Sequence, residues 1–74
     1  MLHHLDARGL SCPLPILKTR QALSRLEGGE VLEVLATDPG SVADFEAFCR
    51  STGHTMLEKD LNAGTFRYRI ERRI

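Results

Sequence analysis

The sequence predicts an α+β fold: a two-layer α/β sandwich in which two helices cover one face of a four-stranded mixed sheet. Four segments are predicted as strands, of which residues 31–37 are a run rich in β-formers and residues 65–70 alternate apolar and basic residues. Two further segments repeat apolar residues at helical spacing. Turns rich in glycine or proline separate them. The predicted order is strand, helix, strand, helix, strand, strand. Because each helix has one apolar stripe, both can cover the same face of the sheet, and the other face stays open.

The first half of the chain predicts a strand, a helix and a second strand. Residues 2–7 form the first strand, and a loop follows at residues 8–11. A helical pattern runs from Pro13 to about Leu26, and the Gly28–Gly29 pair stops it. Residues 31–37 are rich in β-formers and predict the second strand. The helix stripe comprises Ile16, Leu17, Leu23 and Leu26, and the inner face of the second strand comprises Leu32, Val34 and Ala36.

The second half predicts a helix and a hairpin. The turn at residues 38–41 offers Asp38 or Ser41 as a helix cap, and Pro39 suits a first turn. The last two strands span residues 54–60 and 65–70, and the turn at residues 62–64 gives a hairpin signal between them. The stripe of the second helix, which ends at Gly53, comprises Val42, Phe45, Phe48 and Cys49.

Composition limits the class of protein. A chain of 74 residues predicts a single domain, residues 1–74, with one hydrophobic layer and no room for a deep pocket. The formal net charge is zero, so direct nucleic-acid binding is not expected. No segment approaches the roughly 20 apolar residues of a membrane span. Residues 1–4 do not read as a signal peptide, so we expect no membrane association and a cytoplasmic location.

Cys12 is the candidate reactive residue. It stands before Pro13 at the start of the first predicted helix, where an N-cap residue would stand. A helix N-terminus stabilises a thiolate, the reactive form of cysteine. Because proline has no N–H, the donors expected near the thiol are those of Leu14 and Ile16. We therefore predict a stiffly held, outward-facing thiol with a depressed pKa.

Two features of the surrounding sequence bear on that site. A residue before proline resists the helical region, so Leu14 leaves two possible helix starts, Pro13 and Pro15. Cationic side chains close in sequence can add positive field and serve a docking partner: these are Arg8, Lys18 and Arg20.

The run LDARGLSCPLP at residues 5–15 resembles the signature of the TusA/SirA-like small sulfur-carrier family, with its Cys-Pro-x-Pro motif. The resemblance covers nearly the whole chain. It also includes Gly28-Gly29-Glu30, Asp38-Pro39, Phe48-Cys49, Gly53-His54 and the last strand with Tyr68.

The resemblance implies a βαββαβ two-layer sandwich and a carrier-type sulfurtransferase without a classical substrate pocket. By this resemblance Cys12 accepts persulfide sulfur from a cysteine desulfurase or a rhodanese and relays it to an acceptor protein. Arg20 matches a basic helix position associated with partner docking. In the branch of the family that serves transfer-RNA thiolation, the position of Leu14 holds an acidic residue. Because Leu14 departs from it, the acceptor pathway stays open among transfer-RNA thiolation, cofactor biosynthesis and sulfur oxidation. No cofactor is implied.

Two alternatives concern the other thiol and the histidines. Cys49 lies on an apolar stripe, so we expect a buried, inert cysteine, although a Cys12–Cys49 redox pair is the sharper alternative. A metal site is not expected, because neighbours such as His3 and His4 on a strand point to opposite faces. No recognisable ligand spacing links them to His54.

The last strand carries a third alternative. Phe66, Tyr68 and Ile70 would face one way and Arg67 and Arg69 the other, which is typical of a solvated face opposite a buried one. The functional interpretation is a basic patch on a non-catalytic interaction module, which Glu71 and the neutral total charge weaken. On the open face, Val31, Glu33 and Leu35 can seed a dimer or partner contact, or simply be surface residues.

Overall fold

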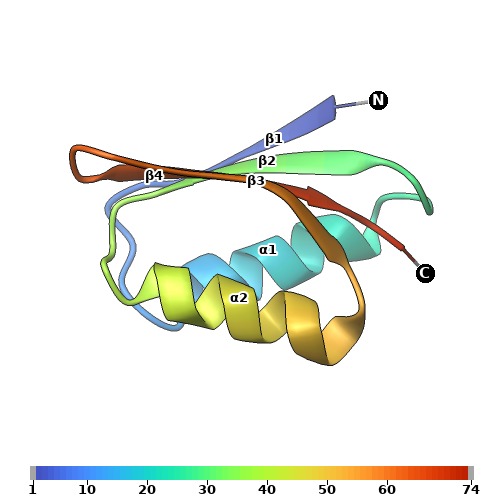
Figure 1. The fold of residues 1–74 in the computed structure, drawn as a ribbon, viewed down its shortest axis with the longest axis horizontal. Coiled ribbons are helices and arrows are strands. Elements are labelled where there is room, and N and C mark those ends of the chain that lie inside the picture. The colour runs from blue at the N-terminus through green and yellow to red at the C-terminus, as the bar shows by residue number, and fades with distance from the viewer. Residues whose placement is uncertain (1, 74) are drawn as a thin grey trace.

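Two helices lie against one face of a four-stranded sheet in the computed structural model, which describes residues 2–73 (Figure 1). The elements are β1 (Leu2–Ala7), α1 (Leu14–Ser24), β2 (Val31–Ala36), α2 (Ser41–Thr52), β3 (Thr55–Asn62) and β4 (Thr65–Glu71). The strand order across the sheet is β1-β2-β4-β3. Strands β1 and β2 are parallel, whereas β4 is antiparallel to both β2 and β3. The predicted two-layer sandwich with a mixed sheet is confirmed.

The order along the chain is strand, helix, strand, helix, strand, strand, as the residue pattern predicts. The βαββαβ order attached to the family resemblance places the second helix one strand later than the structure does. No helix separates the last two strands, because β3 and β4 are antiparallel neighbours that need only a tight turn between them. Ala63 and Gly64 form this turn with φ values of 46° and 86°, typical of a two-residue hairpin loop.

The core lies between the sheet and the helices. Strand β2 contributes Leu32, Val34 and Ala36, all buried, so the predicted inner face of this strand is confirmed. From β4, the ring of Tyr68 is fully buried and stacks on Phe45 of α2, with 4.4 Å between the ring centroids. Such stacked aromatic pairs add stability beyond the area they bury.

The predicted stripe of helix α1 is confirmed for the buried Leu23 and for Ile16 and Leu26, which pack partly buried against the core, and is wrong for Leu17. Pro15, Thr19 and Leu23, four residues apart, face the core. Leu17 is 47% exposed, because it lies about 200° around the helix from Pro15. Thr19 is fully buried, and its hydroxyl donates to the Pro15 carbonyl at 2.8 Å. That internal hydrogen bond lets a polar residue take a core position that the apolar pattern did not indicate.

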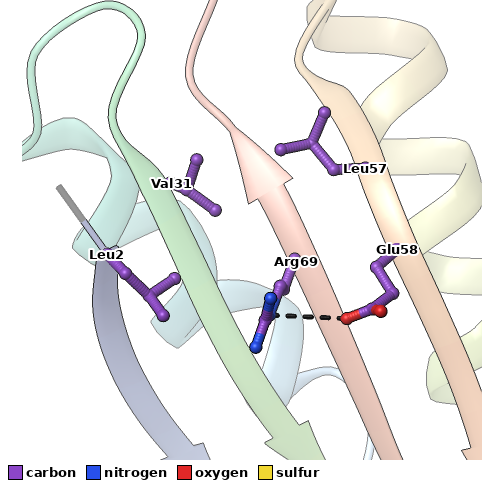
Figure 2. A pocket seen from close by; sticks show the side chains of 5 residues that line it. All are labelled: Leu2, Val31, Leu57, Glu58 and Arg69. Atoms are coloured by element: carbon purple, nitrogen blue, oxygen red, sulfur yellow. Dashed lines mark ion pairs between the residues drawn. The ribbon is translucent and has the colours of Figure 1, made fainter.

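The opposite face of the sheet is not covered by a helix (Figure 1). A hollow of about 480 Å³ lies on this face. Figure 2 shows the side chains that line it, Leu2, Val31 and Leu57 together with the Arg69–Glu58 ion pair. The pairing of β3 with β4 is irregular between Met56 and Glu58. None of the helices within residues 2–73 is long and apolar enough to cross a bilayer.

Candidate functional site

Cys12 lies in the loop between β1 and α1, and its thiol is exposed and free. Strands β1 and β2 are parallel, and each leads into a helix. The two strand-to-helix loops, residues 8–13 and 37–40, therefore meet at the same end of the molecule (Figure 1). This is the end of a parallel pair where functional sites commonly form.

The prolines fix how the chain enters α1. Helix α1 begins at Leu14, with Pro13 as its N-cap and Pro15 in the first turn, so the start lies between the two predicted positions. Leu14 is helical despite the proline that follows it, because Pro15 is buried against the core and the Leu14 N–H donates to the Ser11 carbonyl at 2.9 Å. The expectation that Leu14 leaves its N–H free for the thiol is therefore wrong. The Cys12–Pro13 peptide bond is cis.

Two carboxylates hold Cys12 in place. The Cys12 backbone N–H donates to Oδ2 of Asp38 at 2.9 Å. The Cys12 thiol donates to Oδ2 of Asp44 at 2.9 Å. Asp38 comes from the loop before α2, and Asp44 comes from the first turn of α2.

These contacts raise the pKa of the Cys12 thiol above its usual 9.0, first through the hydrogen bond to Asp44, then through burial, and then through the charges of Asp44 and Asp38. The predicted depression of this pKa is wrong in the isolated chain. The field of the α1 N-terminus is present, but a carboxylate within hydrogen-bonding distance outweighs it.

Cys12 opens onto a shallow hollow of about 340 Å³ between α1 and α2. Arg20 of α1 and Phe48 of α2 form its far part, where the guanidinium carbon lies 5.3 Å from the centroid of the Phe48 ring, a cation–π contact. We call this hollow the Cys12 groove. Its other lining residues are Pro13, Ile16, Asp44, Ala47 and Ser51.

Of the three cations predicted for docking, Arg20 is the one that lines the Cys12 groove. Arg8 instead forms a bidentate pair with Asp6, with Nε–Oδ1 and Nη2–Oδ2 distances of 2.9 Å. These contacts lower the pKa of Asp6 to about 2, chiefly through the side-chain hydrogen bond from Arg8. Lys18 is exposed on α1 and does not line the groove.

The carboxylates beside Cys12 are the residues that sequence reasoning missed. Asp38 was expected only as a possible cap for α2, but Gly40 is the N-cap, with no side-chain cap hydrogen bond. Ser41, the other predicted cap, is buried and bonds Tyr68 instead. A signal for Asp44 did exist, because an acidic residue in the first turn of α2 must lie near the other strand-to-helix loop once β1 and β2 are parallel.

The model of the family described as "Sulfurtransferase TusA" matches residues 3–72 of this chain. The chain belongs to the TusA sulfurtransferase family. The predicted family is thereby confirmed, and sulfur transfer is the activity of the class.

Three individual proteins illustrate the relationship. The sulfur carrier protein TusA of Allochromatium vinosum is 48% identical over 68 residues, which cover 92% of this chain and 90% of that protein. A protein of Neisseria meningitidis serogroup A is 55% identical over 62 residues, 84% of each chain. The crystal structure of a SirA-like protein from Desulfitobacterium hafniense superimposes with a TM-score of 0.83 at 26% identity, with full coverage of both chains.

The second cysteine of this TusA-family chain lies in the core. Cys49 is on the inner side of α2, only 9% exposed, and burial raises the pKa of its thiol. The expectation of a buried cysteine is confirmed. Both thiols are free, and Cys49 does not line the groove onto which Cys12 opens.

The histidines at the start of this TusA-family chain have carboxylate partners. His3 Nε2 lies 3.1 Å from Glu30, and His4 Nδ1 lies 2.9 Å from Glu33. Within residues 2–73 no three histidine, cysteine or acidic side chains cluster in a way that suits a metal ion.

The C-terminal arginines are engaged within the chain. Arg67 and Arg69 on the open face pair with Glu33 and Glu58, and Arg67 also lies near Asp60. Tyr68 and Ile70, which alternate with them, are buried, so the predicted solvated face opposite a buried one is confirmed. Because acidic partners offset these cations, the structure gives little support to a basic docking patch on β4.

Proposed function

We propose that this protein is a sulfur carrier in which Cys12 accepts sulfur from a donor protein as a persulfide and passes it to an acceptor protein. The observation that carries the proposal is an exposed, free thiol that opens onto the Cys12 groove, in a chain of the TusA family. The groove is shallow, which suits a protein surface better than a small-molecule substrate.

The transfer chemistry needs only thiols and persulfides. The Cys12 thiolate attacks the outer sulfur of the donor persulfide, a new S–S bond forms at Cys12, and the donor S–S bond breaks. The donor cysteine leaves as a thiolate and takes up the proton that Cys12 lost. Attack by the acceptor thiol on the outer sulfur repeats the exchange in the other direction. No metal and no external oxidant or reductant enters either step.

We further propose that the donor is a cysteine desulfurase or a rhodanese-type protein, and that the acceptor is the next protein of a sulfur relay. The exposed Arg20 lies over the largely buried ring of Phe48 in the Cys12 groove, and a cation beside an aromatic ring is a composition expected of a docking site. Leu14, 44% exposed at the start of α1, adds an apolar contact next to Cys12.

The test of the carrier role is sulfur loading. Reduced protein is incubated with a cysteine desulfurase and free cysteine, and intact mass is measured without reductant. We expect the mass to increase by one sulfur atom, and we expect Cys12→Ser to abolish the gain. Cys49→Ala is the matched control and should load normally, because Cys49 is buried. If no donor adds sulfur to the wild-type chain, or if the Cys12→Ser variant still loads, the proposal is wrong.

Docking at Arg20 has a separate test. We expect Arg20→Ala to slow loading by the donor protein while the rate with a small neutral disulfide stays the same, because Arg20 contacts the Phe48 ring and lies in the groove. Arg50→Ala is the control, an exposed arginine on α2 that does not line the groove. Equal slowing with protein and small-molecule donors would show that Arg20 acts on the thiol and not on docking.

A further inference from the structure

Asp44 has no assigned role, yet it makes the one side-chain hydrogen bond described for the Cys12 thiol, at 2.9 Å. Its position is well supported, because the Asp44 N–H donates to the Gly40 carbonyl at 3.3 Å in the first turn of α2. Negative charge is favoured at a helix N-terminus, which agrees with the place of Asp44 in the first turn of α2, beside the sulfur.

The geometry allows two roles for Asp44: a general base that removes the thiol proton, or a hydrogen-bond acceptor that fixes the position of the thiol. A carboxylate is a much weaker base than a thiolate, so a proton shared between the two groups stays on sulfur. Asp44 is therefore a poor base for Cys12. Its hydrogen bond favours the protonated thiol and opposes the thiolate.

The other charges near Cys12 do not cancel this effect. Asp38, from the loop before α2, accepts the Cys12 backbone N–H and adds a second negative charge. From α1, Arg20 lines the same groove, with its guanidinium over the Phe48 ring. In the loop of Cys12 itself, Arg8 is paired with Asp6. The reacting sulfur thus lies in a negative local field.

We propose that Asp44 is a positioning and specificity-determining residue, which holds the Cys12 sulfur toward α2 and makes exchange at Cys12 selective for sulfur donors that carry positive charge next to the reacting sulfur. The inference rests on the proposed function for its biological meaning. A cationic group on the docked donor neutralises Asp44 and releases the thiolate. Anionic low-molecular-weight persulfides and disulfides then react slowly with the undocked carrier.

The test uses three aliphatic disulfides of similar length that differ in charge: cystamine, bis(2-hydroxyethyl) disulfide and 3,3′-dithiodipropionate. In each reaction Cys12 forms a mixed disulfide with one half of the reagent, and the other half leaves as a thiolate that takes up a proton. Because the leaving thiols differ in acidity, we compare variants with the same disulfide. The readout is the ratio of the Asp44→Asn rate to the wild-type rate.

We expect this ratio to be largest for the anionic disulfide, intermediate for the neutral one and smallest for the cationic one. The span should be at least about threefold at low ionic strength and should shrink near 0.5 M salt, where exposed charges are screened. The midpoint of the pH–rate profile with the neutral disulfide should also fall in Asp44→Asn. Glu46→Gln is the matched control, with the same charge change on the same helix, and Glu46 pairs with Lys59. Its ratios should be equal for all three disulfides.

Equal ratios for all three disulfides in Asp44→Asn, or the same trend in Glu46→Gln, would overturn the proposal. Asp44→Ser serves as a second variant if the asparagine variant folds poorly, and the salt dependence of the wild-type rates needs no variant at all. The exchange assay uses no persulfide, so it is independent of the loading test. If loading fails and the charge selectivity persists, the sulfur cargo is wrong and the role of Asp44 stands.

Discussion

Tyr68 carries the most deeply buried hydroxyl on the sheet, and its partner is Ser41 on α2. Both side chains are buried, at 0% and 1% exposure, and the two hydroxyl oxygens lie 3.1 Å apart. A buried hydroxyl without a partner costs more than its hydrogen bond contributes when made. This pair therefore joins β4 to the first turn of α2, close to the carboxylates that hold Cys12.

At the residue scale, we predict that Tyr68→Phe lowers the free energy of unfolding by about 1–2 kcal/mol, because it leaves the Ser41 hydroxyl buried and unpaired. The stack on Phe45 remains, so the loss isolates the hydroxyl. Urea denaturation followed by far-UV circular dichroism measures the change. Ser41→Ala should cost a similar amount for the converse reason.

The double variant Tyr68→Phe with Ser41→Ala tests the explanation. It should lose clearly less than the sum of the two single losses, because neither hydroxyl is then left without a partner. Additive losses would contradict a direct coupling between the two groups.

The residue scale is also where sequence reasoning about the site reaches its limit. Cys12 and its flanking prolines could be selected from the sequence, because residue type and helix-start chemistry are local properties. The sign of the thiol pKa shift was not predicted, because Asp44 is 32 positions away along the chain and comes near Cys12 only through the parallel pairing of β1 with β2. One hydrogen bond to a residue that distant reversed a prediction made from the neighbours of Cys12.

At the element scale, the C-terminal segment closes the end of α1. One nitrogen of the Arg72 guanidinium, Nη1, donates to the carbonyls of Leu23 and Leu26 at 2.7 and 2.6 Å. The Arg72 backbone also exchanges hydrogen bonds with Gly29 and Glu30 in the loop that leads into β2. A cation that satisfies the last carbonyls of a helix also complements its dipole.

We predict that Arg72→Ala lowers the free energy of unfolding by about 1–2 kcal/mol, because hydrogen bonds to a charged group are worth more than neutral ones. Urea denaturation measures the loss. Arg73→Ala is the matched control: Arg73 is exposed and pairs with Glu71, so its loss should stay within about 0.5 kcal/mol. Similar losses for the two variants would mean that the contact with α1 adds nothing.

Helix α2 ends through the backbone of a glycine. Gly53 has φ of 85°, and its N–H donates to the Cys49 carbonyl at 3.0 Å. We predict that Gly53→Ala lowers the free energy of unfolding by about 1 kcal/mol, because a side chain disfavours that backbone conformation. The loss is measured as a lower thermal midpoint. Gly28→Ala is the control, since Gly28 has ordinary φ and open space around it. It should leave the midpoint unchanged or raise it, and a fall like that of Gly53→Ala would contradict the explanation.

Sequence patterns predicted most of the elements and missed details of their ends and faces. The stripe of α2 and the alternation of β4 were correct, because each follows one period. In α1 the prediction was correct for Ile16, Leu23 and Leu26 and wrong for Leu17. It missed Pro15 and Thr19, which are buried although neither residue type is typical of a core. The order β1-β2-β4-β3 was not predicted, since alternation reveals which face a residue occupies and not which strand is its neighbour.

At the scale of the whole molecule, the formal net charge is zero, but the ion pairs between charged side chains make the stability of the fold depend on pH. The pKa values of Asp6, Glu30, Glu33 and Glu46 are all lowered by partners in the fold. A carboxylate with a lowered pKa contributes stability above its unfolded pKa and loses that stability as pH falls through its folded pKa. The Cys12 thiol has a raised pKa, so its contribution is lost instead as pH rises through that value, above 9.0. Stability should therefore fall toward acid pH and toward alkaline pH.

Glu33 gives the sharpest test of the acid side of this profile. Burial raises its pKa, but the hydrogen bonds from Arg69 and His4 outweigh burial and leave the pKa below the usual 4.5. We expect Glu33→Gln to be less stable than the wild type at about pH 5.5, and the difference to shrink as pH falls through the lowered pKa of Glu33, where the wild type also comes to carry a neutral side chain. Thermal midpoints across that range measure the difference. Glu27→Gln, at an exposed loop carboxylate, should track the wild type throughout. If the stability difference between Glu33→Gln and the wild type stays constant with pH, Glu33 acts through its shape on the open face. Its charge then contributes nothing to the loss of stability at acid pH.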